Sequence, residues 1–208
     1  MREPEDDLRG RLRAGEREAF AELYEQCARI VYRHALRLTG DWSTAEEVMS
    51  DTFLAAWRGR ERLSEGEGSP LPWLLGIATH KCENARRGLR RRLAFLARQP
   101  RPPVVADFAP ETAGRIDDAR RLAVVQDALG HLRRQEREVL SLCVWSGLDY
   151  QQTAEALGVP VGTVRSRLSR ARKKLARLVE EKAEPRAGRG EVTSTAALAA
   201  LPVREETT

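Results

Sequence analysis

Apolar side chains recur at intervals of three and four along most of the chain, which is the period of an amphipathic α-helix. The first such stretch covers residues 17–38 and is stopped at Gly40. A second covers residues 43–60, where Ser43 is a good N-cap residue and Glu46 follows three positions later, as in a capping box. Because no alternating apolar and polar run with hairpin turns is visible, the pattern predicts an all-α fold.

Glycines and prolines divide this helical pattern into two small domains. The Gly- and Pro-bearing loop at 63–72 separates the second helix from a third one. Residues 99–114 contain four prolines, which lack an amide donor and restrict the chain, so we expect a flexible linker there. The predicted organisation is a helical domain at 17–98, the linker at 99–114, a second helical domain at 115–181 and a disordered tail at 182–208.

The C-terminal half contains the pattern of a helix-turn-helix. A helical block at 116–146, broken near residue 132, comes first. The short helix at 150–157 then ends at Gly158, the usual residue for a left-handed helix stop, and Pro160 suits the first turn of the next helix. A long second helix follows, and we expect this pair of helices to bind DNA.

The long second helix separates apolar from cationic side chains. Its apolar stripe repeats at four and three, and consists of Val164, Leu168, Ala171, Leu175 and Leu178. Residues 165–177 hold seven basic side chains and no acid, whereas a merely soluble helix usually mixes both signs at i, i+4. Such a helix fits the major groove, where Arg170 can bind a guanine, Ser166 can contact either kind of base, and the flanking cations neutralise phosphates.

Composition and charge agree with a DNA-binding helical protein. Charged residues make up 32% and aromatic residues 5% of the 208, the net charge is +5 and the pI is about 9.5. The distribution of charge is more informative than its sum, because residues 86–101 also hold seven arginines and no acid. Two separated basic patches suggest two contacts with one polyanion.

The sequence lacks the residue patterns of a disulfide framework, a metal site, a secretory signal or a membrane span. Cys27, Cys82 and Cys143 are far apart and odd in number, so we expect reduced thiols and not a disulfide framework. His80 and Cys82 have no second His/Cys pair with which to bind a metal. The acidic N-terminus (MREPEDD) lacks the apolar core of a secretory signal, and no apolar run approaches membrane-spanning length. We therefore expect a protein of the reducing cytoplasm with no metal, cofactor, small-molecule substrate or membrane partner.

Four segments resemble the sigma-70 family of transcription initiation factors. GTVRSRLSRARKKL (162–175) is similar to the DNA-reading helix of the family's fourth domain, and residues 128–161 resemble the rest of that domain. AEEVMSDTFLAAWR (45–58) is similar to the core-polymerase-binding helix of the second domain, and SPLPWLLGIATHKCENARRGLRR (69–91) resembles the segment that melts and captures the −10 promoter element. With a short linker in place of a third domain, the chain resembles the extracytoplasmic function (ECF) group.

The resemblance implies partners and site residues. The first domain would bind the clamp of the largest catalytic subunit of core RNA polymerase and open the −10 element, with the loop Leu63–Pro70 holding a flipped base, while the second domain would recognise the −35 element. The implied polymerase contacts, each of which also fits a solvated helix face, are Glu46, Glu47, Ser50, Asp51 and Arg58. The implied −10 contacts are Ser64, Ser69, His80, Lys81, Asn84, Arg87 and Arg91. The implied −35 contacts are Thr163, Arg165, Ser166, Arg167, Ser169, Arg170, Arg172, Lys173, Lys174 and Arg177.

Several residues depart from the family's pattern. Thr79 stands where the family often has Arg and His80 where it usually has Asn, and both would fall at the −10 readout, so no base preference is carried over. His80 either contacts a base or faces solvent. Thr153 replaces an aliphatic residue, and we expect its hydroxyl to bond back to a carbonyl one turn earlier. Trp73 could stack on a base, but its helical spacing favours core packing, as for Trp57.

Two other functions fit parts of the sequence. A self-standing helix-turn-helix repressor or activator would use the N-terminal half for dimerisation or sensing, but the PWLL segment and the arginine-rich extension argue against it. A nucleic-acid enzyme such as a recombinase would need a carboxylate cluster, a nucleophile motif or a phosphate-binding glycine loop, none of which is visible. We therefore expect a bacterial, nucleoid-associated ECF sigma factor that is not an enzyme. Many family members have an anti-sigma partner, which here could wedge between the two domains and hide both DNA surfaces.

Overall fold

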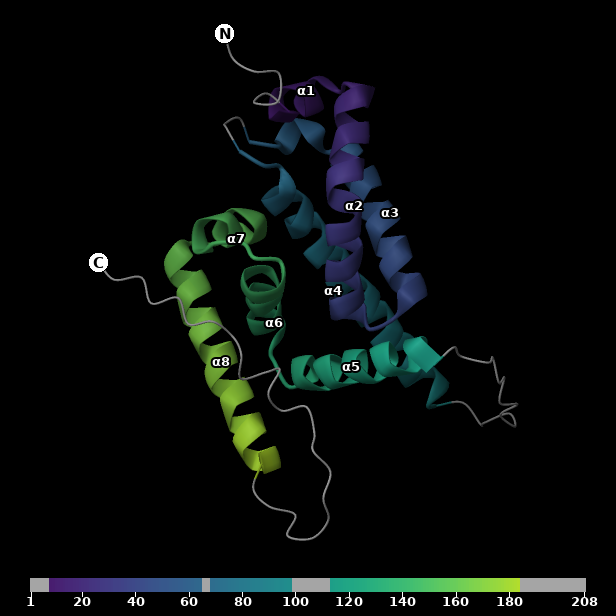
Figure 1. Cartoon of the computed structure of the whole chain (residues 1–208), viewed down its shortest axis with the longest axis vertical. Helices are drawn as coiled ribbons and strands as arrows, with labels where there is room; N and C mark the ends of the chain where they lie inside the picture. The colour runs from purple at the N-terminus through teal and green to yellow at the C-terminus, as the bar shows by residue number, and fades with distance from the viewer. Residues whose placement is uncertain (1–7, 65–67, 99–112, 184–208) are drawn as a thin grey trace.

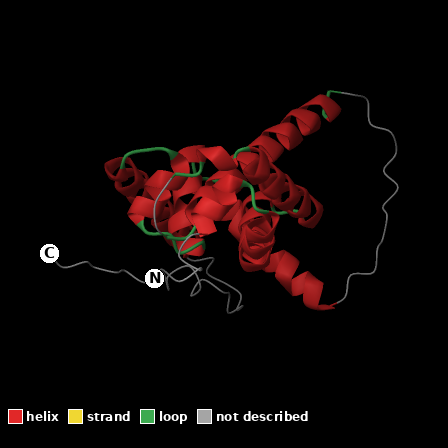
Figure 2. Ribbon diagram, turned by 90° about the horizontal axis from the view of Figure 1, so that it is seen from above, coloured by secondary structure: helices red, strands yellow, loops and turns green. Residues whose placement is uncertain are grey.

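Every regular element in the described part of the chain is a helix (Figures 1 and 2), which confirms the predicted all-α class. The computed structural model describes residues 8–64, 68–98 and 113–183. The elements are α1 (Leu8–Ala14), α2 (Arg17–Thr39), α3 (Trp42–Arg58), η2 (Arg60–Arg62), α4 (Leu71–Leu96), α5 (Ala113–Gly130), α6 (Arg134–Leu140), η3 (Ser141–Trp145), α7 (Tyr150–Leu157) and α8 (Val161–Ala183). We call α1–α4 with η2 the N-terminal helix group, and α5–α8 with η3 the C-terminal helix group.

Most of the predicted linker and tail lies outside the described residues. At the described ends the bounds differ from the prediction, because residues 113–114 already belong to α5 and residues 182–183 still belong to α8. The MREPEDD segment and residues 65–67, in the middle of the predicted −10 loop, are also outside the described part.

The junction between α2 and α3 is set by a glycine and an aspartate. The break predicted at Gly40 is confirmed, since this residue adopts a φ of 77°, in the left-handed region that glycine tolerates. The predicted N-cap is wrong: the Asp41 side chain accepts a 2.7 Å hydrogen bond from the Thr44 amide. Hydrogen bonding to Thr44 holds the pKa of Asp41 below its ordinary value. Because Asp41 caps the helix first, Ser43 and Glu46 lie on the exposed first turns of α3 and not in a capping box.

The helix-turn-helix forms where the sequence predicts it. The Asp149 side chain accepts a 2.7 Å bond from the Gln152 amide, and the Gln152 side chain accepts a 3.0 Å bond from the Asp149 amide, so a capping box starts α7. Gly158 ends the helix with a φ of 63°. Val164 of α8 is fully buried in the same apolar cluster as Ala154 of α7.

Two local features were not predicted. α1 is too short and too charged to show a helical period, yet its Leu12 is fully buried against the rest of the N-terminal group. η3 is a π-helical turn that continues α6 and contacts α7.

The expectation for Thr153 is wrong, because the η3 turn brings Cys143 close to it. The Thr153 hydroxyl lies 3.2 Å from the Cys143 Sγ instead of bonding to a carbonyl of its own helix.

The two helix groups pack directly on each other. In Figure 1, α6 and α7 lie between α8 and the α2–α4 layers, and α5 crosses below. The buried core is shared, since Ala35 and Leu38 of α2 and Cys82 of α4 belong to one apolar cluster with residues of α6 and α8. Leu142 of η3 belongs to the other cluster, which is otherwise centred on the N-terminal group. We call this contact between α2/α4 and α5/α6/η3/α7 the docking interface.

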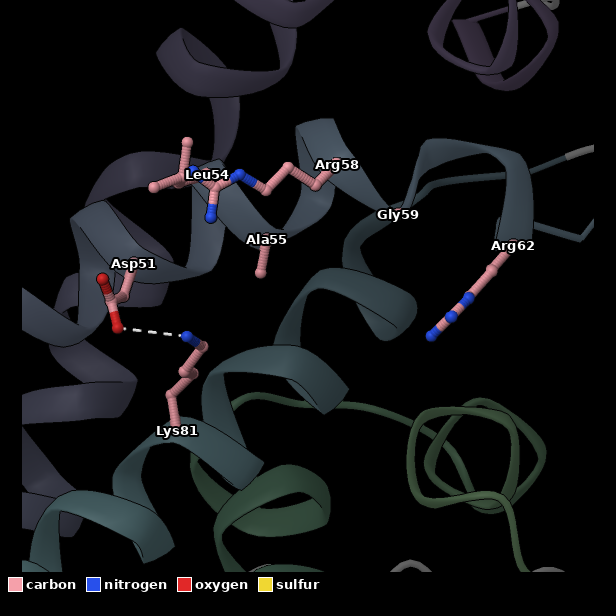
Figure 3. Close-up of a pocket in the computed structure, with 7 residues that line it drawn as sticks. All are labelled: Asp51, Leu54, Ala55, Arg58, Gly59, Arg62 and Lys81. Carbon is pink, nitrogen blue, oxygen red and sulfur yellow. Dashed lines mark hydrogen bonds and ion pairs between the residues drawn. The ribbon is translucent and has the colours of Figure 1, made fainter.

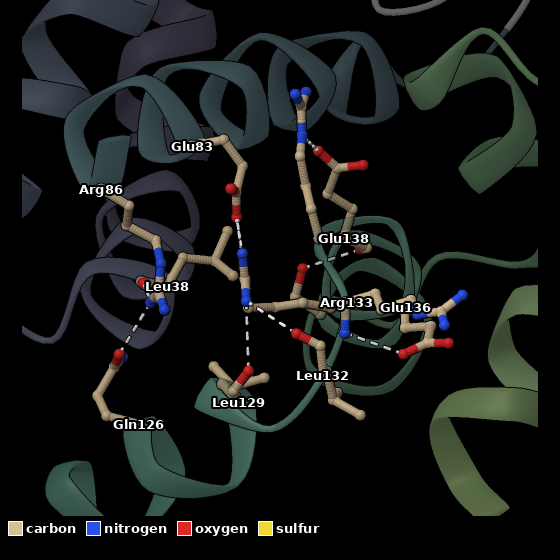
Figure 4. Close-up of polar contacts among 12 residues, drawn as sticks. Leu38, Glu83, Arg86, Gln126, Leu129, Leu132, Arg133, Glu136 and Glu138 are labelled. Carbon is tan, nitrogen blue, oxygen red and sulfur yellow. Dashed lines mark hydrogen bonds and ion pairs between the residues drawn. The ribbon is translucent and has the colours of Figure 1, made fainter. Parts of the chain in front are cut away.

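A buried ion pair between Glu83 of α4 and Arg137 of α6 lies in the docking interface, and Figure 4 labels Glu83 and marks the contact of its carboxylate with a dashed line. The Arg137 guanidinium of α6 donates to Oε1 of Glu83 of α4 at 2.8 and 3.0 Å, and both side chains are at most 5% exposed. Arg137 also donates to the carbonyl oxygens of Leu129 and Leu132 at 3.3 Å. Loss of one partner of such a pair leaves a buried charge without compensation, so the pair specifies which surfaces meet.

A buried histidine also joins the two groups. The His34 Nδ1 lies 3.0 Å from the Ser146 hydroxyl and its Nε2 lies 2.9 Å from the Thr79 hydroxyl. Thr79 donates its own proton to the carbonyl of Leu75 at 2.8 Å and is fully buried. The placement of Thr79 at the −10 readout is therefore wrong, because α4 turns this residue toward the core while the next one, His80, is exposed.

We predict that His34 makes the fold sensitive to mild acid. Burial, and secondarily the charge of Arg37, lower the pKa of His34 from 6.5 to about 3, so the unfolded chain binds a proton below pH 6.5 that the folded chain does not. Between pH 7 and pH 5 the free energy of unfolding of the wild type should fall by about 2 kcal/mol more than that of His34→Gln. Urea unfolding at both pH values measures this difference, and parallel pH profiles for the two proteins would contradict it.

Candidate nucleic-acid interface

α8 presents a basic face to solvent. Its predicted apolar stripe is buried from Val164 to Leu175, with Leu178 half-buried, so the opposite face points outward. Eight of the ten predicted −35 contacts are exposed, and Thr163 and Arg167 are half-buried on the flanks. Basic side chains along this face have no acidic neighbour on their own helix between residues 165 and 177, so the positive field there is uncompensated along the helix.

Two arginines near the start of α8 are ordered by neighbours. The Arg170 Nε donates to the Ser166 carbonyl at 3.2 Å, and its Nη2 lies 3.4 Å from the Ser166 hydroxyl. The Arg165 guanidinium lies 5.7 Å from the ring centre of Tyr150 on α7, within cation–π range. Arg170 and Ser166, the two candidates for base contacts, therefore lie side by side.

The second basic surface runs along α4. Asn84, Arg87 and Arg91 line one hollow of about 490 Å³ together with Arg90, which the sequence analysis did not single out. The position of Arg90 within the arginine run was visible in the sequence, but which arginines share a face became clear only with the helix in place. His80 is exposed one turn before Asn84.

Two further predicted −10 contacts, Ser64 and Ser69, are not among the residues that line this hollow and lie at the two ends of the predicted −10 loop. Arg9 of α1 donates to the Ser64 hydroxyl at 3.0 Å, to the Gly68 carbonyl at 3.1 Å and to the Ser69 carbonyl at 3.0 Å. Arg9 is 8% exposed, and it also pairs with Glu155 of α7 at 3.4 Å. The residue that fixes this loop was missed because α1 was not predicted.

The predicted polymerase contacts are exposed on α3. Asp51 accepts a 3.0 Å ion pair from Lys81 of α4, so the polymerase set and the −10 set meet at this point. Figure 3 shows the pocket around this pair, which is also lined by Arg58 and by Leu54 and Arg62, two residues that the sequence analysis did not select. Its volume is about 300 Å³.

Neither a metal centre nor a membrane span is found in the described part of the chain. No three His, Cys, Asp or Glu residues there are placed to hold a metal ion. Cys27, Cys82 and Cys143 are free thiols, and burial raises the pKa of Cys82 to about 12. None of the helices formed by the described residues is long and apolar enough to cross a membrane.

Comparison with known proteins decides the family. The family models for sigma-70 region 2 and sigma-70 region 4 match residues 23–92 and 122–175. The ECF RNA polymerase sigma factor SigL of Mycobacterium tuberculosis is 31% identical over 169 residues, which are 81% of this chain and 93% of SigL. The chain belongs to the ECF group of sigma-70 factors. This sigma factor therefore binds core RNA polymerase and directs promoter-specific transcription initiation through −10 and −35 elements.

Other relatives agree. The ECF sigma factor SigK of Mycobacterium bovis is 31% identical over 178 residues, covering 82% of this sigma factor and 90% of SigK. The structure of CnrH in complex with the cytosolic domain of CnrY aligns with 85% of this chain and 97% of CnrH, at 26% identity and a TM-score of 0.62. RpoE of Bartonella quintana, solved with the anti-sigma factor NepR, aligns with 80% of this chain and 98% of RpoE, at 25% identity and a TM-score of 0.56.

Proposed function

We propose that the C-terminal helix group recognises the −35 element through α8. The observation that carries this assignment is the division of α8 into a buried apolar stripe and an exposed face of Arg, Lys and Ser. Ser166 and Arg170 contact base edges, and the flanking cations contact phosphates. Arg170 must leave its contact with Ser166 to reach a guanine, which an exposed side chain can do within nanoseconds.

The N-terminal helix group has two tasks in this proposal. The α4 face with His80, Asn84, Arg87 and Arg91 contacts the −10 element, and Arg90 in the same hollow joins it. Arg9 holds Ser64 and Ser69 at the ends of the loop that receives a base extracted from the duplex. The exposed face of α3, with Glu46, Glu47, Ser50, Asp51 and Arg58, binds the polymerase clamp.

The remaining assignments follow from these roles of the two helix groups. The factor supplies positioning and DNA contacts, while catalysis belongs to the polymerase, so the chain itself is not an enzyme. A protein that acts only on promoters works at the nucleoid. An anti-sigma partner is supported by the CnrH and RpoE structures, both of which are complexes with a second protein.

Run-off transcription with purified core polymerase tests the proposal as a whole. Transcripts from a cognate promoter should appear only when the sigma factor is added, and should be lost when either the −10 or the −35 element is scrambled. Transcripts that survive scrambling of the −35 element would contradict the role of α8, and those that survive scrambling of the −10 element would contradict the role of α4.

We predict different phenotypes for two basic residues of α8. Arg170→Ala in the holoenzyme should reduce discrimination at one −35 base pair by ~1–3 kcal/mol, because a bidentate base contact is lost. Lys174→Ala should weaken binding to all DNA sequences alike, because only a phosphate contact is lost. The slope of the logarithm of the binding constant against the logarithm of salt concentration should become shallower by about one. Binding titrations on single-base promoter variants at several salt concentrations measure both effects. Identical profiles for the two variants would refute the assignment of the faces.

We predict that the acidic face of α3 determines affinity for core polymerase. Glu47→Arg should raise the Kd for core polymerase about fivefold or more, since an exposed complementary charge contributes on the order of 1 kcal/mol. Glu18→Arg is the matched control, because Glu18 is an exposed acid on α2 that is not among the residues proposed to bind polymerase. An equal loss of affinity in both variants would show a general charge effect and not a contact surface.

A further inference from the structure

The end of α4 presents a stripe of exposed leucines. Leu89, Leu93 and Leu96 are 53%, 56% and 50% exposed, and their spacing of four and three places them on one face of the helix. The same face is fully buried earlier in α4, at Leu75 and Cys82. The leucine stripe therefore continues the core-facing side of α4 beyond the described helices that cover it, and a contiguous apolar patch of this kind indicates a contact.

Promoter DNA does not cover the leucine stripe. Leu89 and Leu93 follow two residues after Arg87 and Arg91, respectively, which is about 200° around the helix. Arg87 and Arg91 line the hollow that we assign to the −10 element. DNA held in this hollow leaves the leucines on the opposite side of α4, so they need another partner.

A second copy of this chain does not fit the leucine stripe either. Three half-exposed leucines offer on the order of 300 Å² per chain, well below the ~800 Å² per partner of a stable interface. Residues 86–98 also hold six arginines and no acid, so two copies would repel each other. A segment of the same chain needs far less contact area, because its tether supplies an effective concentration on the order of 1 mM.

The C-terminal tail contains a segment that fits the leucine stripe in size and charge. Its run AALAAL (196–201) follows Ser194 and Thr195, which favour a helix start, and ends before Pro202, which stops a helix. Both the run and the stripe are about two helical turns long. Six residues are too few for an isolated helix, so we expect the run to fold only on contact. Residues 191–208 hold three acids and one arginine, a charge opposite to that of the end of α4.

The tail is long enough to leave the neighbourhood of α8. The run begins 13 residues after Ala183, the last residue of α8, so it has a reach of up to about 40 Å. This reach is about the full length of α4, a helix of 26 residues that rises ~1.5 Å per residue. The tail, like Leu93 and Leu96, lies outside residues 23–92 and 122–175, the parts of the chain that match the two family models.

We propose that residues 196–201 of the tail pack on the leucine stripe of α4. Leu198 and Leu201 are three residues apart, so they share one face of a short helix and make the contact. The contact keeps the end of α4 helical, because a helix end without packing frays. It thereby holds Arg90 and Arg91 in their hollow, a consequence that rests on the proposed −10 role of α4.

Hydrogen exchange in the free full-length chain tests the contact. A contact with a dissociation constant of ~0.1 mM is about 90% formed at an effective concentration of ~1 mM, so the amides of residues 196–201 should exchange about tenfold more slowly than in Leu93→Gln. Phe95→Gln is the matched control, because Phe95 is 61% exposed on the same helix but lies two residues from Leu93, on another face. Unprotected amides in the wild type, or an equal loss of protection in both variants, would overturn the proposal.

A photocrosslinker identifies what the run contacts. An apolar crosslinking side chain at position 198 should form adducts with residues 89–96 of the same chain. Adducts with the linker at 99–112, with another element or with a second copy would overturn the proposal. Protection of residues 89–96 that appears only when core polymerase is added would assign the stripe to polymerase, and would overturn the proposal as well.

Binding of holoenzyme to forked promoter DNA with an intact −10 element measures the consequence for α4. The double variant Leu198→Asp/Leu201→Asp should bind about two- to fivefold more weakly than the wild type, because the end of α4 frays. Gly88→Ala should restore binding in the double variant, since alanine favours a helix over glycine and its Cβ would have no atom within 4 Å. Unchanged binding of the double variant, or a loss that Gly88→Ala does not restore, would overturn the support of α4 by the tail. Wild-type binding that does not depend on the −10 element would instead overturn the proposed function, while exchange and crosslinking still decide the contact.

Discussion

The contact between the Gly76 segment of α4 and the Ala156 carbonyl of α7 is the constraint on which the arrangement of this sigma factor depends. A helix backbone can approach another this closely only where a side chain is missing. Once α4 and α7 touch, Glu83 comes within reach of Arg137, and His34 lies between Thr79 and Ser146. The two helix groups then share apolar clusters, and the molecule has a joint core in place of two separate ones.

The surfaces that this arrangement leaves exposed are those that carry charge. The basic face of α8, the arginine-lined hollow of α4 and the outer face of α3 are all solvent-accessible while the interface is closed. Docking therefore does not hide the proposed contact residues. The surface at which a wedged partner was expected is occupied here by the C-terminal helix group itself.

Helical periodicity predicted the class of fold and the helix-turn-helix, because a buried stripe such as Val164 to Leu175 determines which face of a helix turns inward. The family resemblance supplied the assignments for α3 and α4 only as sets of residues, because spacing along the sequence does not show that Asp51 and Lys81 form an ion pair. The sequence pattern could not predict which side chains contact each other when they come from segments far apart in the chain. Thr79 was placed at the −10 readout by its position in the family's pattern, yet the helix turns it toward His34. Arg9 was missed because the seven residues of α1 show too little pattern.

The proposed function assigns the −35 element to α8 and the −10 element to α4 of the same chain. The most direct measurement is site-specific photocrosslinking of the holoenzyme to promoter DNA, with the crosslinker placed at Ser166 of α8 or at Asn84 of α4. Crosslinks from position 166 should fall in the −35 element, and crosslinks from position 84 should fall in the −10 element. Crosslinks from either position that fall in the other element, or outside both, would contradict the assignment.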